Sequence, residues 1–242
     1  MNVIADGPEL GDAFGRALLD LVAGAADPIV VERDDGLVAL DSIDYLAGLD
    51  QHDQWALDRA TGRVLDVGAG AGRGSLALQK RGQEVVALDV SPGATLACQR
   101  RGVRKAYTGS VQQAAADGMS GSFDSALLLG NNFGLLASRE AAGQFLTGLG
   151  ELLYPGGVIV GIALDPYSTD KQIHLDYHER NRQRGHMGGQ ITMRIRYQRL
   201  ATDWFDWLAL SPEELTEIAA SAGWRVAAML PGVLYAAVLT RA

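Results

Sequence analysis

Apolar runs and helical patterns alternate regularly between residues 63 and 164. Strands are expected over residues 63–67, 84–90, 103–109, 123–130 and 156–164, with a helical segment between successive strands. These strands are apolar almost throughout, as parallel strands that are buried on both faces are. The alternation predicts an α/β fold in which a doubly wound parallel sheet carries helices on both faces.

The pattern changes after Leu164. Residues 165–190 are polar and rich in turn formers, whereas apolar and polar side chains alternate over residues 191–197. Together with the strand-like run over 204–211, this alternation predicts an inserted antiparallel hairpin after the fifth strand. A helix over 211–223 and strands over 224–230 and 233–241 complete the pattern. We expect residues 165–210 to act as a lid or substrate-binding insertion.

The first 60 residues show helical patterns separated by loops. One pattern covers residues 14–25, and a second covers residues 45–61. We therefore divide the chain into a helical N-terminal cap over residues 1–60 and a main α/β domain over residues 61–242. The segment from Tyr45 to Trp55 is a second candidate for a lid.

Composition and charge narrow the functional classes. The 242 residues carry a formal net charge of −8, which argues against a basic face for nucleic acid. The single cysteine, Cys98, excludes an internal disulfide and favours a reducing compartment. We find no secretory signal and no apolar run long enough to span a membrane. These features favour a cytoplasmic protein that binds a small molecule.

The most informative stretch is VLDVGAGAGRG, residues 64–74, with glycine at every second position from 68 to 74. Glycines let the backbone turn sharply and let a ligand lie on the main chain, at the edge where open α/β sheets bind ligands. A dinucleotide fingerprint would place its third glycine at position 73, where Arg73 stands. Asp66 would repel a pyrophosphate, while Asp89, at the end of the next strand, can accept hydrogen bonds from both ribose hydroxyls. The pattern describes a nucleoside with a positively charged tail and no phosphates.

Residues 64–94, VLDVGAGAGRGSLALQKRGQEVVALDVSPGA, resemble the opening half of the class I S-adenosylmethionine-dependent methyltransferases. The resemblance continues through FDSALLLGNNFGLL and LLYPGGVIVG and covers about residues 45–164. It implies a Rossmann-like, seven-stranded sheet whose last strand inserts antiparallel. It also implies S-adenosylmethionine as the cofactor.

The same resemblance implies site residues by position. Asp66 would meet the methionine amino group, Asp89 the ribose diol and Val90 the adenine. Ser110 or a neighbouring backbone group would replace the acidic residue that commonly receives the adenine amino group. The expected cofactor-binding residues are Tyr45, Asp66, Gly68, Ala69, Gly70, Gly72, Asp89, Val90, Gly109, Ser110, Val111, Gly130 and Asn131.

Polar residues of the insertion indicate which kinds of acceptor the protein could bind and activate. Six arginines between residues 180 and 199 favour a solvated hairpin face; the alternative is a site for an anionic acceptor, because guanidinium groups match carboxylates. An amine acceptor needs only a lone pair, whereas a hydroxyl or carbon acceptor requires a general base. The candidate bases are His174, His178 and His186.

Two further groups in the insertion have alternative interpretations. His174, Asp176 and His178 would share one face of a strand and could bind a metal, but a solvated face is the more common outcome and no metal is expected. Trp204, Phe205 and Trp207 could pack the hairpin onto the sheet or line a substrate pocket.

The preferred function is methyl transfer from S-adenosylmethionine to a small-molecule acceptor, either a metabolite or a natural product. One alternative is a protein that binds S-adenosylmethionine without transferring its methyl group, as a sensor or an assisted cyclase. The other is an NAD-dependent oxidoreductase, against which Arg73 and Asp66 argue. The sequence leaves methylation at oxygen, nitrogen or carbon open.

Overall fold

The predicted alternation forms a seven-stranded sheet in the computed structural model, which describes residues 8–25, 27–41 and 45–242. The strand order is β12-β13-β8-β7-β4-β5-β6: six strands run parallel to one another, and β13 inserts antiparallel between β8 and β12. This confirms the predicted fold class and the antiparallel insertion of the last strand. The strands are β4 (Val64–Val67), β5 (Val85–Asp89), β6 (Ala106–Thr108), β7 (Phe123–Leu128), β8 (Leu153–Leu164), β12 (Trp224–Leu230) and β13 (Leu234–Arg241).

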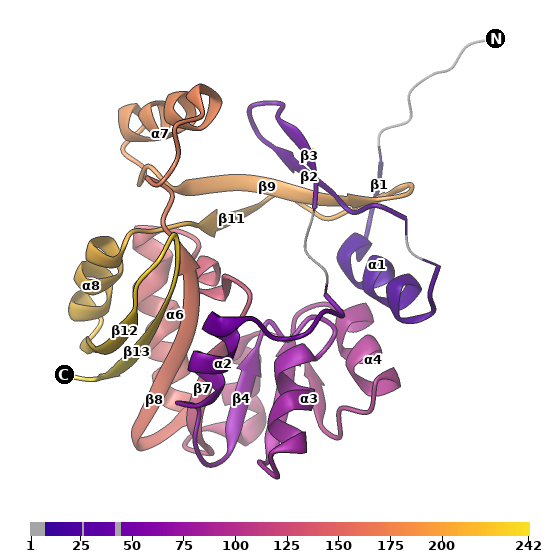
Figure 1. Cartoon of the computed structure of the whole chain (residues 1–242), viewed down its shortest axis with the longest axis vertical. Coiled ribbons are helices and arrows are strands. Elements are labelled where there is room, and N and C mark those ends of the chain that lie inside the picture. The colour runs from indigo at the N-terminus through magenta and orange to yellow at the C-terminus, as the bar shows by residue number, and fades with distance from the viewer. Residues whose placement is uncertain (1–7, 26, 42–44) are drawn as a thin grey trace.

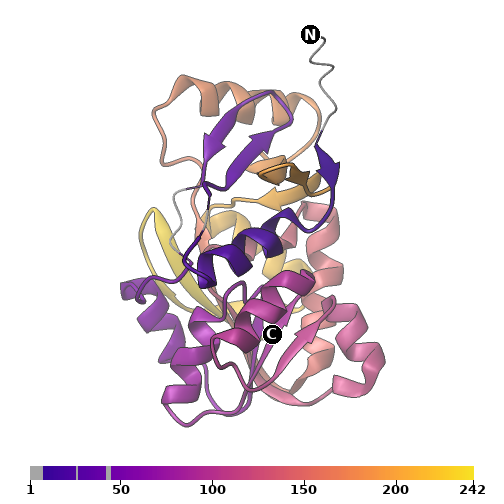
Figure 2. The same ribbon diagram turned by 90° about the vertical axis from the view of Figure 1, so that its right-hand side faces the viewer.

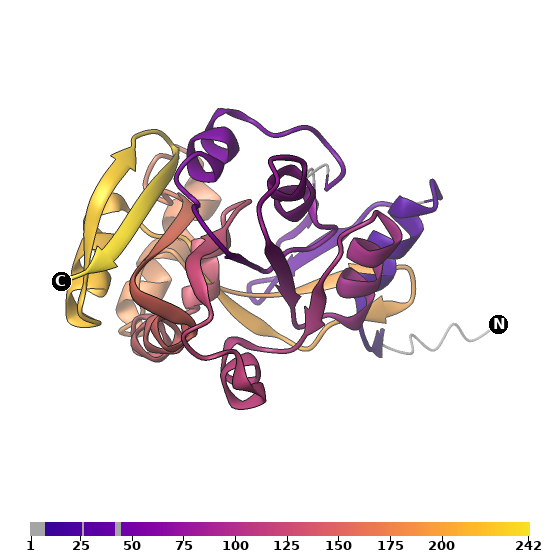
Figure 3. The ribbon, with the colours of Figure 1, turned by 90° about the horizontal axis from the view of Figure 1, so that it is seen from below.

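Helices cover both faces of this sheet because its strands are apolar on both sides. Leu65 faces the cluster that includes α6 (Arg139–Leu152) and α8 (Pro212–Ser221), whereas Val64 faces α2 (Gln51–Leu57) and α3 (Arg73–Lys80). The other elements of this layer are α4 (Pro92–Arg100), α5 (Val111–Ala114), the π-helix Ala115–Met119 and the 3-10 helix Asn132–Leu136. Figure 3 shows this layer from below, with β12 and β13 at one edge.

A second sheet lies across the carboxyl ends of the parallel strands (Figure 1). Its order is β1-β10-β9-β2-β3, and β11 pairs antiparallel with β9, which confirms the predicted hairpin. The strands are β1 (Glu9–Leu10), β2 (Val30–Arg33), β3 (Val38–Leu40), β9 (Gln190–Tyr197), β10 (Leu200–Ala201) and β11 (Phe205–Leu208). Helix α1 (Ala13–Val22) lies between this sheet and α4 (Figure 2).

The N-terminal region corrects the expectation of a purely helical cap. Strands β2 and β3 lie between α1 and α2, and β2 pairs with β9 of the insertion. Such short strands carry no recognisable period, and they form because the exposed edge of β9 offers hydrogen-bonding partners from far along the sequence. The lid candidate Tyr45–Trp55 includes part of α2, and residues 42–44 lie outside the described part of the chain.

The polar stretch after β8 also differs from the expectation. Helix α7 (Gln172–Gln183) contains His174, Asp176 and His178, which therefore do not share the face of a strand. In a helix, residues two positions apart point in different directions, so Asp176 lies away from the two histidines. Over residues 8–25, 27–41 and 45–242, no group of three or more potential metal-ligating side chains is found, and no helix is long and apolar enough to cross a membrane.

Candidate functional site

A cavity of about 960 Å³ separates the two sheets. Its lower wall is the carboxyl edge of the seven-stranded sheet, with the glycine turn after β4 and the ends of β5 and β7. Its upper wall belongs to the second sheet, through side chains of β2, β9 and β11 such as Val31, Met193 and Trp207. Small-molecule sites span roughly 300–1,000 Å³, so this volume is at the upper end of that range.

The glycine turn presents main chain to the cavity. Gly68, Gly70 and Gly72 have φ angles of +68°, +55° and +76°, which favour glycine. Gly68, Ala69 and Gly70 line the cavity. Gly72 does not: a Cβ there would lie 2.7 Å from Val103, so this glycine faces the interior and begins α3. The expectation that Gly72 borders the ligand is thus replaced by a role in shaping the turn.

Asp66 lies directly beneath the turn and is almost fully buried. Its Oδ2 accepts a hydrogen bond from Ser75 Oγ at 2.7 Å. Burial raises its pKa to about 6, so the carboxylate is ionised at neutral pH but weakly solvated. A buried negative charge at the cavity floor attracts a cationic ligand.

Asp89 connects the end of β5 to the same turn. Its Oδ2 accepts a hydrogen bond from Gly70 N and its Oδ1 accepts one from Ser91 N, both at 2.9 Å. Burial raises the pKa of Asp89 above its ordinary value. Val90, the next residue, is 70% exposed and lines the cavity, where it offers an apolar contact for a flat ring.

The loops after β6 and β7 close the two ends of the lower wall. Ser110 and Val111 line the cavity, whereas Gly109 does not. The Ser110 hydroxyl accepts a hydrogen bond from Gln113 N and thereby caps α5, so it is already engaged. Gly130 and Asn131 also line the cavity, and Asn131 Oδ1 accepts a hydrogen bond from Leu164 N at 2.7 Å.

Two polar residues outside the list of expected cofactor-binding residues support these loops. Asn132 Nδ2 donates to the carbonyls of Val67 and Gly68, at 3.0 and 2.8 Å, and so holds the glycine turn. Asp12 accepts hydrogen bonds from Ser91 Oγ and Gly93 N, and thereby fastens α1 to the start of α4. No local pattern marks Asp12, because its partners are about 80 residues away. Asn132, in contrast, directly follows Asn131, which is one of the expected site residues.

Tyr45 lines the cavity as expected. Its hydroxyl donates to Asp41 at 2.5 Å, and its ring packs edge-on against Phe14 of α1. Burial, strengthened by the negative charge of Asp41, raises the pKa of this tyrosine, which stays neutral. Tyr45 thus joins the N-terminal region to the upper part of the site.

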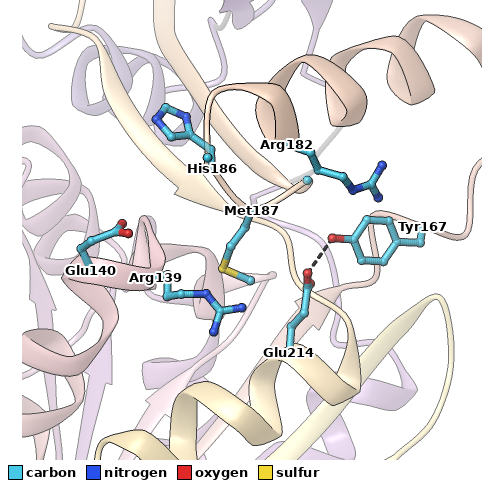
Figure 4. Close-up of a pocket in the computed structure, with 9 residues that line it drawn as sticks. Arg139, Glu140, Tyr167, Arg182, His186, Met187 and Glu214 are labelled. Carbon is cyan, nitrogen blue, oxygen red and sulfur yellow. Dashed lines mark hydrogen bonds between the residues drawn. The ribbon is translucent and has the colours of Figure 1, made fainter.

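The three histidines do not line this cavity. His174 Nδ1 lies 3.3 Å from Arg33 Nη1, and His178 is buried edge-on against Tyr167. Partial burial, followed by nearby cationic charge, lowers the pKa of His174 and His178. His186 lines a separate, smaller cleft together with Arg139, Glu140 and Arg182 (Figure 4). This placement gives no support to the expectation that one of them is a general base for a substrate in the large cavity.

The arginine cluster likewise lies outside the large cavity, and its members form ion pairs. Arg194 and Arg196 contact Glu32 on the face of the second sheet opposite Met193 and Ile195, which line the cavity. The remaining pairs are Arg180 with Asp34 and Asp35, Arg184 with Asp34, Arg182 with Glu179, and Arg199 with Glu9. These contacts with carboxylates of the chain favour the solvated-face interpretation and give no support to a site for an anionic acceptor in the large cavity.

All three aromatic residues after β10 line the cavity, namely Trp204, Phe205 and Trp207. Trp207 packs so closely on the 3-10 helix after β7 that a Cβ at Gly134 would lie 2.0 Å from its indole. Phe205 also packs against the small core around α1 and β9. These residues thus combine the two alternatives, packing of the hairpin and lining of the pocket.

Comparisons with known proteins agree with this architecture. Residues 64–157 match the family model described as a methyltransferase domain. A search of curated proteins finds no match. The chain is similar to the crystal structure of an S-adenosylmethionine-dependent methyltransferase from Bacteroides fragilis in complex with S-adenosylhomocysteine, with a TM-score of 0.81, 29% identity and coverage of 96% of this chain and 95% of that one.

Two more distant structures share the fold. A methyltransferase from Methanosarcina mazei has a TM-score of 0.62 and 13% identity, with 81% of this chain and 99% of that one covered. The CcbJ methyltransferase from Streptomyces caelestis has a TM-score of 0.60 and 16% identity, with 84% and 100% covered. The chain therefore carries a class I methyltransferase domain and is an S-adenosylmethionine-dependent methyltransferase.

Proposed function

We propose that this enzyme transfers a methyl group to a small-molecule acceptor held between the two sheets. The observation that carries the proposal is the cavity of about 960 Å³, in which the glycine turn, Asp66 and Asp89 face an aromatic upper wall. This volume has room for a nucleoside cofactor on one wall and a second small molecule on the other.

The lower wall fits S-adenosylmethionine residue by residue. Asp66 supplies the buried negative charge for the methionine amino group, and the main chain of Gly68, Ala69 and Gly70 borders the methionine and ribose. Asp89 accepts from the ribose hydroxyls, while its bonds to Gly70 N and Ser91 N fix its orientation. Val90, Ser110 and Val111 border the adenine. Gly130, Asn131 and Tyr45 lie where cofactor and acceptor meet, and Gly72 and Gly109 shape the loops.

The bound sulfonium supplies an activated methyl group, so the protein's main task is alignment. Fixed geometry can contribute effective molarities on the order of 10⁵–10⁸ M. The N-terminal region and residues 165–210 form the cover over the reacting atoms, and exclusion of water strengthens the electrostatic effect of the buried carboxylates. Such a cover fits an acceptor small enough to be enclosed.

Calorimetry and product analysis test the proposal together. We expect the purified protein to bind S-adenosylhomocysteine with one site per chain and to bind NAD⁺ at least about a hundredfold more weakly, because Asp66 repels a pyrophosphate. With S-adenosylmethionine and a mixed metabolite extract, S-adenosylhomocysteine should accumulate and one extract component should gain a methyl mass. Preferential binding of NAD⁺, or cofactor binding without S-adenosylhomocysteine formation across extracts, would favour the oxidoreductase or the non-transferring alternative.

A further inference from the structure

The charges that line the cavity are strongly unbalanced. Over the described residues, six aspartates and one arginine border it, with no lysine and no histidine. The arginine, Arg73, is bound by both oxygens of Asp53 and is therefore already neutralised. Any ligand in this cavity therefore meets a negative electrostatic potential. The positive charge of S-adenosylmethionine compensates only part of it.

Five of the six aspartates divide into two sets according to their wall; the sixth, Asp41, accepts a hydrogen bond from the Tyr45 hydroxyl. Asp12, Asp66 and Asp89 lie on the lower side, where each accepts hydrogen bonds from α3, α4 or the glycine turn. Asp203 and Asp206 lie on the upper side, in the turn before β11 and in β11 itself. The lower set serves the cofactor wall, so the upper set faces the acceptor.

Asp203 differs from the other upper-wall carboxylate. Asp206 accepts a hydrogen bond from Thr192 Oγ1 at 2.6 Å, which fixes it against β9. Asp203 is exposed, and in the described part of the chain it has no hydrogen-bond or ion-pair partner. Its charge is thus available to a ligand without breaking an existing contact.

Aromatic surface lies beside this carboxylate. Trp204 follows Asp203 directly, and Phe205 and Trp207 line the cavity from β11. The contact with Gly134 fixes the Trp207 indole in place. Rigid aromatic faces next to a negative charge suit a cation that carries an apolar ring, through ring stacking and cation–π attraction.

We propose that the acceptor is an amine attached to an apolar ring, bound with its amine toward Asp203 and its ring against Trp207. This inference rests on the proposed methyl transfer and names its substrate class. In the reaction, the ammonium form that Asp203 attracts first loses one proton to solvent; the lone pair of the resulting neutral amine then forms the new N–C bond while the S–C bond breaks and its electrons stay on sulfur. The amine proton leaves to solvent, and the products are the methylated amine and S-adenosylhomocysteine.

Matched ligands test the charge preference directly. Phenethylamine and tryptamine are compared with 3-phenylpropanoate and indole-3-propionate, which carry the same rings and a carboxylate instead of the amine. With the protein saturated by S-adenosylhomocysteine, we expect the amines to bind about tenfold more tightly than the carboxylates, and less so at high salt. Asp203→Asn should reduce this preference to about threefold or less, while S-adenosylhomocysteine binding stays unchanged.

A control variant separates the local effect from the net charge of the protein. Asp170→Asn removes one exposed carboxylate that does not line the cavity, and it should preserve the amine preference. Equal or tighter binding of the carboxylates overturns the inference, and so does the absence of amine binding by a protein that binds S-adenosylhomocysteine. Failure to bind S-adenosylhomocysteine would instead contradict the proposed function.

Discussion

The lower and upper walls of the cavity are built in different ways. The lower wall consists of main chain and buried carboxylates, each held by hydrogen bonds from neighbouring loops, as for Asp89 with Gly70 and Ser91. The upper wall consists of side chains on a sheet assembled from residues 9–40 and 190–208, and it includes Asp203, which has no partner among the residues that the structure describes. A wall of main chain tolerates few substitutions, whereas a wall of side chains can change its ligand by replacing residues one at a time.

This difference explains how one fold can keep a cofactor and vary an acceptor. Side-chain substitutions on the upper wall leave the glycine turn and its supporting bonds untouched. We expect lower-wall variants to lose cofactor affinity or alter stability, and upper-wall variants to change the acceptor response while cofactor affinity is preserved.

The largest effect is expected from Asp89→Ala. The change removes the ribose acceptor and leaves Gly70 N and Ser91 N without their carboxylate, so two charge-assisted hydrogen bonds are lost. We expect S-adenosylhomocysteine affinity to fall on the order of a thousandfold, or about 4 kcal/mol, by calorimetry. Asp89→Asn keeps one acceptor oxygen and should lose less. Unchanged affinity in a folded Asp89→Ala protein would contradict the assignment of the lower wall.

The pH dependence of stability should report Asp66. Burial raises the pKa of Asp66 from 3.8 to about 6, so the folded state keeps the proton to higher pH than the unfolded state does. The stability that this proton contributes is complete below pH of about 4 and is lost as pH rises through about 6, with a total of about 3 kcal/mol. Urea unfolding of the wild type and Asp66→Asn should therefore show a stability difference that changes across this interval. A pH-independent difference would argue against a buried titrating group.

Gly134→Ala tests the contact that fixes the upper wall. The added Cβ would lie 2.0 Å from the Trp207 indole and must displace it. We expect a loss of about 1–3 kcal/mol in the free energy of unfolding and a higher KM for the acceptor, with cofactor affinity preserved. Gly143→Ala, in α6 with open space around its Cβ, is the matched control and should be stabilising. A parallel loss of cofactor affinity would show that the two walls are not independent.

The smallest effect is expected from Arg199→Ala. The Arg199 side chain is 83% exposed and pairs with an exposed Glu9 at 3.4 Å. Removal should change the free energy of unfolding by less than about 1 kcal/mol and leave acceptor KM unchanged. A marked rise in acceptor KM would restore a role for the arginine cluster in binding an anion.

Local sequence patterns predicted the lower wall well, because its parts lie close together in the sequence or follow the regular alternation of strands and helices. The strands, the glycine turn and Asp89 follow from periodicity and from spacing along consecutive βα units. Asp66 and Asp89 both border the cavity. Gly72 shows the limit of that reasoning: its spacing matches its neighbours, yet Val103 and Cys98 place it toward the interior.

The upper wall was less accessible to sequence reasoning. The hairpin and its alternation were predicted correctly, but β2 and β3 were not. Residues of α7 were expected to share one face of a strand, and they form a helix instead. The alternative in which the arginines bind an anionic acceptor stayed open in the sequence because their partners Glu32 and Asp34 lie about 150 residues earlier in the chain.

The sequence alone determined the α/β layer and the cofactor chemistry, since buried strands, glycine turns and strand-end carboxylates are set by neighbouring residues. Only the tertiary structure decided which side chains meet across the cavity. Residues 9–40 and 190–208 pair through backbone hydrogen bonds that carry no sequence signature, and that pairing selects Asp203 and Trp207 for the acceptor while turning the arginines toward internal ion pairs.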